Sequence, residues 1–114
     1  AGLLLVWDER DLPWGTIRIR ERGSPGTHNG AKSVVNALGT EEFARVRLGV
    51  GPDHPVGDLA AYVLRPMKKA ELEVAATMIE EAANAVELIL THGLAPAMNR
   101  FNHRNPPAAG NPLP

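Results

Sequence analysis

Three short segments of the chain have the pattern of β-strands. The first, residues 3–7 (LLLVW), is a continuous apolar run of the kind found in strands covered on both faces, as in a parallel or mixed α/β sheet. Residues 16–20 (TIRIR) and 45–50 (RVRLGV) alternate between apolar and polar positions, which is typical of strands with one face toward the core. Residues 8–15 (DERDLPWG) hold aspartates, a proline and a glycine, and are predicted to form a turn.

Two further segments have the period of an α-helix. Residues 31–38 (AKSVVNAL) predict a short helix stopped by Gly39, and residues 68–92 predict a long helix stopped by Gly93. After Gly93 the pattern predicts one or two last helical turns. The apolar positions of the long helix recur at i, i+3, i+4 and i+7. They are Leu72, Ala75, Ala76, Ile79, Ala82, Ala83, Val86, Ile89 and Leu90.

The order of these elements predicts an α/β fold with a mixed, twisted sheet flanked by helices. Three strands are few for this class, so we expect the chain to supply only part of the sheet. A strand that opens directly after Ala1 suggests the same, with further sequence upstream or in another chain. We expect one domain over residues 1–102 and a disordered, proline-rich tail over 103–114. Residues 49–58 are rich in glycine and proline and are predicted to be mobile.

Composition narrows the chemistry that the chain can carry. Its 114 residues have a net charge of −1, so any surface for a polyanion must be local. There is no cysteine, which excludes disulfides, thiolate zinc sites and a cysteine nucleophile, and fits a reducing compartment. The four histidines show no metal-ligand spacing, and no glycine-rich phosphate-binding motif occurs. The opening apolar run is too short to span a bilayer. We therefore expect no metal, no cofactor and no membrane.

Two places along the chain are candidates for ligand contact. Asp8 follows the first strand, and ligands of open α/β sheets bind at the carboxyl ends of strands; alternatively, Asp8 caps the turn. The second place is His28–Asn29–Gly30. There, Asn-Gly is a hairpin signal, but Asn29 is also suited to cap the following helix or to offer its amide to a ligand.

Five arginines and no lysine gather on the two alternating strands and just after the first of them. They are Arg18, Arg20, Arg22, Arg45 and Arg47. Alternation along the strands predicts that they share outward faces. Such charges usually only keep a surface hydrated, and nearby acidic residues are placed to neutralise some of them. Guanidinium groups alone, without lysines, nevertheless fit contacts to phosphate.

Five motifs together resemble one known family. In order they are VWDERDLPWG, GTHNGAKSVVNALGT, FARVRLGVG, YVL and AMNRFN. This combination, from about residue 3 to 102, resembles the C-terminal half of bacterial-type peptidyl-tRNA hydrolase. The resemblance implies hydrolysis of the ester that links a peptide to the ribose of its tRNA, which recycles the tRNA during translation. It also implies a cytoplasmic protein, monomeric at full length, whose partner is the acceptor end of peptidyl-tRNA.

The resemblance also assigns roles to single residues. In the family a histidine is the catalytic base and a carboxylate orients it, and Asp8 matches that carboxylate. Asn29 matches an asparagine that contacts the substrate near the ester, and His28 matches its neighbour in the cleft. Arg20 and Arg47 match basic residues that contact a tRNA phosphate. The segment 51–64 resembles a lid over the cleft.

Part of the family pattern has no counterpart in this chain. The Thr-Arg-His-Asn segment that carries the catalytic histidine is absent, as are the Gly-Asn-Pro-Gly and Met-Asn-x-Ser-Gly segments. His28 does not match the catalytic base. We therefore expect a chain that carries the orienting carboxylate and the tRNA-facing part of a site, and that is inactive alone. The alternative is a non-catalytic RNA-binding homologue with the same fold.

Overall fold

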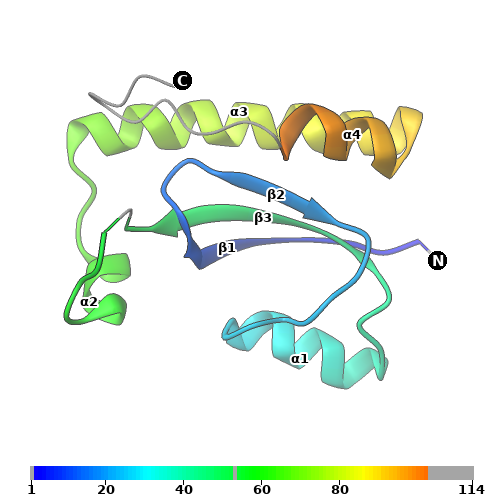
Figure 1. Cartoon of the computed structure of the whole chain (residues 1–114), viewed down its shortest axis with the longest axis horizontal. Coiled ribbons are helices and arrows are strands. Elements are labelled where there is room, and N and C mark those ends of the chain that lie inside the picture. Colours follow the sequence, from blue (N-terminus) through cyan, green and yellow to red (C-terminus); the bar gives the residue numbers. More distant parts are fainter. Residues whose placement is uncertain (1, 53, 103–114) are drawn as a thin grey trace.

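The computed structural model describes residues 2–52 and 54–102, so the predicted tail at 103–114 lies outside the described residues. The described chain is a mixed α/β unit, as predicted (Figure 1). Its elements follow in the order β1 (Leu4–Pro13), β2 (Ile17–Arg20), α1 (Asn29–Leu38), β3 (Ala44–Gly51), α2 (Leu59–Leu64), α3 (Lys69–His92) and α4 (Leu94–Phe101).

The three strands form one open sheet in the order β1-β3-β2. β1 runs parallel to β3, and β2 runs antiparallel to it. Helices α3 and α4 lie along one side of this sheet and α1 lies on the other (Figure 1). The two faces of the sheet therefore have different surroundings, and Arg45 and Arg47, two residues apart on β3, lie on the same one.

The core lies between the sheet and the two C-terminal helices. Ile17, Ile19 and Val46 project from β2 and β3 onto apolar side chains of α3 and α4. The helical contributions are Met78, Ala82, Ala85, Ala97 and Phe101. The sequence placed the apolar stripe of α3 partly on the wrong face, because Leu72, Ile79 and Leu90 are exposed. Periodicity finds the helix, but the alanine-rich turns allow the buried stripe to rotate around it.

β1 is longer than the sequence predicted, and the expected turn at residues 8–15 is mostly strand. Regular pairing with β3 runs from Leu4↔Ala44 to Glu9↔Gly49 and resumes, after an irregularity, at Pro13↔Gly51. Glycine is required where the irregular part of β1 approaches β3. A Cβ at Gly49 would lie 2.0 Å from the carbonyl oxygen of Pro13. Long-range pairing with a glycine-containing strand therefore overrides the local turn signals.

The apolar run at the start of β1 is not covered on both faces in the described chain. Val6 is 44% exposed. Among the described residues, no strand pairs with the outer edge of β1. The exposure of Val6 contradicts the predicted coverage of both faces of this strand within the described chain.

The C-terminal end of α4 is joined to the edge of the sheet by one side chain. Asn102 accepts a hydrogen bond from the Ile19 backbone N–H at 2.7 Å and donates one to the Ile19 carbonyl at 2.9 Å. The amide thus takes the place of a neighbouring strand on the free edge of β2. No local pattern in the sequence indicates this role.

Candidate active site

Asp8 lies within β1, near the end of its regular pairing with β3. It stands opposite Leu48 in the register, and its side chain is 68% exposed. It therefore neither ends the strand nor caps a turn, which was the alternative reading of the sequence. Its Oδ1 lies 3.3 Å from Nε2 of His28, so a strand and the start of a helix twenty residues later meet at this carboxylate.

His28 is the N-cap of α1, a role for which Asn29 was one of the alternatives weighed from the sequence. Its Nδ1 accepts a hydrogen bond from the Ala31 backbone N–H at 3.0 Å. Helix α1 begins at Asn29 and not in a hairpin, and it ends before Gly39, whose φ of 72° is the left-handed geometry of a helix stop. Histidine is not among the preferred N-caps, so propensity pointed to its neighbour.

Asn29 is the first residue of α1 and is exposed. Its side-chain amide makes no hydrogen bond among the residues that the structure describes. Because it directly follows His28, it lies next to the contact between His28 and Asp8. The structure therefore brings three of the predicted site residues together at the junction of β1 and α1.

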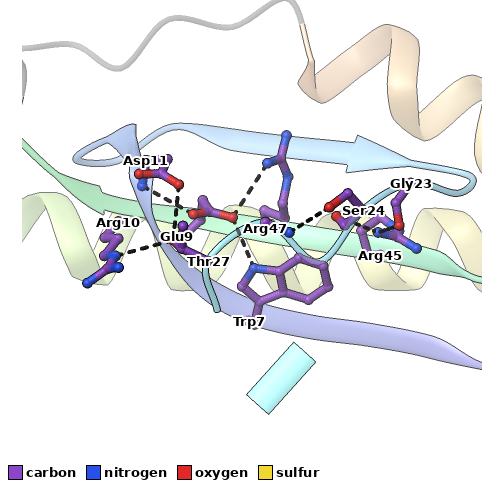
Figure 2. Close-up of polar contacts among 10 residues, drawn as sticks. Trp7, Glu9, Arg10, Asp11, Gly23, Ser24, Thr27, Arg45 and Arg47 are labelled. Atoms are coloured by element: carbon purple, nitrogen blue, oxygen red, sulfur yellow. Dashed lines mark hydrogen bonds and ion pairs between the residues drawn. The ribbon is translucent and has the colours of Figure 1, made fainter. Parts of the chain in front are cut away.

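Arg45 is not part of an outward arginine face. It is 1% exposed and donates to the carbonyls of Glu41 (2.8 Å) and Phe43 (3.1 Å). It also donates to the carbonyl of Gly23 (2.8 Å), with a longer contact to that of Ser24 (3.4 Å) (Figure 2). Alternation gave its direction correctly but not its burial, because the loops on either side of α1 cover this part of the sheet. Burial lowers the pKa of Arg45 from its ordinary value.

Arg47 faces Glu9, one of the nearby acidic residues expected to neutralise some of the arginines, but the burial of this carboxylate was not expected. Glu9 is 2% exposed, and its Oε1 lies 3.5 Å from Nη1 of Arg47 and accepts from Trp7 Nε1 at 3.2 Å. Its other oxygen accepts from the Asp11 backbone N–H (Figure 2). The Nε of Arg47 is buried and has no hydrogen-bond partner among the described residues. The burial of Glu9 follows from the greater length of β1. When the strand continues past residue 7, Trp7 and Glu9 lie on the same face of it.

Three arginines remain on the face of β2 and β3 that carries Arg47. The register places Arg18 directly opposite Arg47, with Arg20 two residues along the same strand. Burial lowers the pKa of Arg18, and the charges of Arg20 and Arg47 lower it further. Arg18 and Arg20 each donate only to the carbonyl of the preceding residue, and neither has an ion pair in the described chain. We call Arg18, Arg20 and Arg47 the arginine face.

The structure places the predicted residues in two groups. Asp8, His28 and Asn29 lie at the junction of β1 and α1, whereas Arg20 and Arg47 belong to the arginine face. No hydrogen bond or ion pair joins the two groups within the described ranges. In those same ranges, no group of three or more histidine and carboxylate side chains is placed to hold a metal ion. No described helix is both long and apolar enough to cross a membrane.

A model of the peptidyl-tRNA hydrolase family matches residues 1–109. The chain belongs to the peptidyl-tRNA hydrolase family. The Koribacter versatilis hydrolase is 48% identical over 109 residues, which cover 95% of this chain and 54% of that relative. The Acidobacterium capsulatum hydrolase is 51% identical over 112 residues, which cover 94% of this chain and 57% of the relative.

Solved structures agree with the sequence relatives. The crystal structure of peptidyl-tRNA hydrolase from Acinetobacter baumannii superposes with a TM-score of 0.76 at 29% identity, over 90% of this chain and 52% of that one. The family expected from the motifs and the fold class expected from the order of the elements are thus confirmed. The chain spans about half the length of the curated hydrolases that it matches.

Proposed function

We propose that this chain is the C-terminal part of a peptidyl-tRNA hydrolase and contributes the orienting carboxylate and the tRNA-facing surface. The observation that carries the proposal is that the Asp8 carboxylate is exposed and has only one of its two oxygens hydrogen-bonded among the described residues. One oxygen contacts His28, while the other makes no contact among the described residues, on a side chain that is 68% exposed. An imidazole from the remainder of a full-length hydrolase can therefore reach this carboxylate.

The proposed chemistry is ester hydrolysis by general base catalysis. A histidine outside this chain would take a proton from the water that attacks the ester carbonyl. Asp8 would hold that imidazole in the correct tautomer and stabilise the imidazolium that forms, as carboxylates do in other hydrolases. Asn29, exposed beside Asp8, is placed to donate its amide N–H to the substrate near the ester. No metal or cofactor is needed for these steps.

His28 is poorly suited to be that base in the observed arrangement. Its Nδ1 lone pair accepts the Ala31 N–H, and its other nitrogen contacts Asp8. Of the other described histidines, His92 contacts Thr91 at the far end of α3. Because the family segment that carries the catalytic histidine is also absent from this chain, we expect the isolated chain to bind tRNA without hydrolysing it.

The arginine face is the proposed contact for tRNA phosphate. Arg20 is exposed and has no ion pair in the described chain, so it can take a phosphate oxygen at little cost. Arg47 is mostly covered and neutralises Glu9, so its contribution is partly structural. We therefore assign the freely available phosphate contact to Arg20 and a shared role to Arg47. The proposal includes a cytoplasmic, monomeric full-length protein, with residues 51–64 as a lid.

A fusion tests the catalytic part of the proposal. The part of the Koribacter versatilis hydrolase that this chain does not cover is joined to the chain, and we call the product the completed hydrolase. With peptidyl-tRNA as substrate, Asp8→Asn should lower kcat by on the order of 10²–10⁴-fold, the usual contribution of general base catalysis. Asp11→Asn is the matched control, because it removes a nearby exposed carboxylate that contacts Thr27 instead. A wild-type rate in Asp8→Asn would refute the assignment of the orienting carboxylate.

Salt dependence of tRNA binding tests the phosphate contact. In the isolated chain, Arg20→Ala should weaken binding and reduce the slope of log K against log salt by about 0.7–0.9, the loss of one phosphate. Arg22→Ala is the control, since Arg22 is also an exposed arginine but faces Glu42 at 3.8 Å. An unchanged slope in Arg20→Ala would remove that residue from the interface.

The runner-up function is a non-catalytic RNA-binding protein of the same fold. One observation favours it: the arginine face lies within this chain, whereas the Thr-Arg-His-Asn segment that carries the family's catalytic histidine does not occur in it. The two functions differ in the completed hydrolase. Turnover by that protein supports the hydrolase, while tight tRNA binding without turnover supports the binding protein.

A further inference from the structure

The imidazole of His28 connects two elements that carry site residues. One ring nitrogen accepts the Ala31 N–H in the first turn of α1, and the other lies 3.3 Å from Asp8 Oδ1 on β1. Both nitrogens of the ring are thus engaged. The helix turn that begins with Asn29 and the carboxylate of Asp8 are therefore held by a single side chain.

These two contacts define the proton position on the ring. A backbone N–H can only donate, so Nδ1 must present its lone pair to Ala31 and carry no proton. In the neutral ring the proton is then on Nε2, and it is donated to Asp8. A bound N–H also opposes rotation of an exposed carboxylate about its terminal bond, and so keeps the second oxygen turned away from His28.

The imidazole ring of His28 has close neighbours on two sides, Trp7 and Gly30. Its centroid lies 5.8 Å from that of the buried Trp7, at an interplanar angle of 35°. On another side, a Cβ added at Gly30 would lie 3.0 Å from Cε1 and 3.3 Å from Nδ1 of His28. This gives the His-Asn-Gly segment a physical reading. Histidine caps and contacts Asp8, asparagine faces outward, and glycine leaves room for the ring.

We propose that His28 is a positioning residue that holds Asp8 and the Asn29 end of α1 in one fixed arrangement, with its imidazole in the Nε2–H tautomer. The structural part of the proposal, which is the positioning of Asp8 and α1 and the tautomer of the ring, follows from the two contacts of the ring nitrogens. The catalytic consequence, a correctly turned Asp8 oxygen for the base, rests on the proposed hydrolase function. In this role His28 acts through Asp8 and the first turn of α1.

Nitrogen-15 NMR of the isolated chain near neutral pH tests the structural part without any assay of activity. Long-range proton–nitrogen correlations should report an unprotonated Nδ1 and a protonated Nε2 for His28, with the Ala31 amide protected from exchange. Asp8→Asn should perturb the Nε2 resonance and leave the Ala31 amide protected. An Nδ1–H tautomer, or an Nε2 resonance that does not respond to Asp8→Asn, would overturn the proposal.

Three substitutions at His28 separate its two contacts. His28→Asn keeps a good N-cap for Ala31 but is too short to reach Asp8. His28→Gln places an amide N–H near the former Nε2 position and gives up the cap. His28→Ala removes both. In the completed hydrolase, His28→Asn should fold like wild type and keep KM, but lower kcat by about 10- to 150-fold, as expected for one hydrogen bond to a charged group.

The kinetic outcomes discriminate among the roles of His28. Partial recovery of kcat in His28→Gln relative to His28→Ala supports positioning through Asp8. A wild-type kcat in His28→Asn would mean that His28 is only a helix cap and would overturn the proposal. A loss of 10³-fold or more in His28→Asn, with folding intact, would make His28 the base and would also overturn it. If Asp8→Asn has no kinetic effect while the NMR results stand, the proposed function fails and the structural part survives.

Discussion

Replacement of Arg45 should unfold the protein far more readily than replacement of any exposed arginine. Arg45→Met keeps much of the apolar stem beside Phe43, whose ring centroid is 4.6 Å from the guanidinium carbon. It removes three short hydrogen bonds to backbone carbonyls and one longer contact. Those carbonyls belong to the loops on both sides of α1. The substitution therefore removes the hydrogen bonds that hold these two loops against this face of the sheet.

The size of the effect follows from these bonds. A hydrogen bond from a charged donor contributes about 1.5–3 kcal/mol net. Three such bonds would give about 4.5–9 kcal/mol, but two reductions apply. The freed carbonyls of Gly23 and Glu41 can be rehydrated at the surface, and the cost of burying the guanidinium, which lowers its pKa, is recovered. We expect a loss of about 3 kcal/mol, a large part of the 5–15 kcal/mol typical of small domains.

Urea unfolding followed by circular dichroism measures this loss. With a slope of about 1.5 kcal/mol/M for a chain of this size, the midpoint of Arg45→Met should fall by about 2 M. Arg22→Met is the control, because its exposed ion pair with Glu42 contributes less than about 0.5 kcal/mol. Equal midpoints for Arg45→Met and Arg22→Met would refute the view that Arg45 is structural and would return it to the arginine face.

Two further predictions concern the C-terminal helices. Asn102→Ala should cost about 1–2 kcal/mol by urea unfolding, because both hydrogen bonds to the Ile19 backbone are lost; a change below about 0.3 kcal/mol would mean that the edge of β2 needs no partner. The Arg65 guanidinium, with help from the Lys68 backbone N–H, lowers the pKa of Glu71 from 4.5 to about 2. Its stabilising contribution should be complete above pH 4.5 and decline as the pH falls toward 2. The melting temperature of Glu71→Gln should lack this decline with pH. If the melting temperatures of wild type and variant fall in parallel between pH 4.5 and 2, the prediction is wrong.

The sequence predicted the class of the fold because its strand and helix patterns are strong and well separated. It could not predict the length of β1. The aspartates, Pro13 and Gly15 are local turn signals, and only pairing with a distant strand that contains Gly49 and Gly51 overrides them. That single error also concealed the burial of Glu9, because an acidic residue in a turn is expected in water, whereas in an extended β1 it shares a face with Trp7.

The candidate site was predicted in part, and the errors have physical causes. Alternation gives the direction of a side chain but not what covers it, so Arg45 and Arg20 looked alike in sequence although one is buried and the other exposed. Cap propensity favoured Asn29, while the tertiary contact with Asp8 selects His28. Asn102 has no local signal at all, because its partner Ile19 lies 83 residues away.

The central claim is that this chain carries the carboxylate and the tRNA-facing surface of a peptidyl-tRNA hydrolase without its catalytic base. The most direct test is turnover of peptidyl-tRNA by the isolated chain and by the completed hydrolase, measured side by side at equal concentration. We predict binding but no hydrolysis by the isolated chain, and hydrolysis by the completed protein that falls on Asp8→Asn substitution. Robust turnover by the isolated chain would contradict the claim, because the base would then lie within these 114 residues.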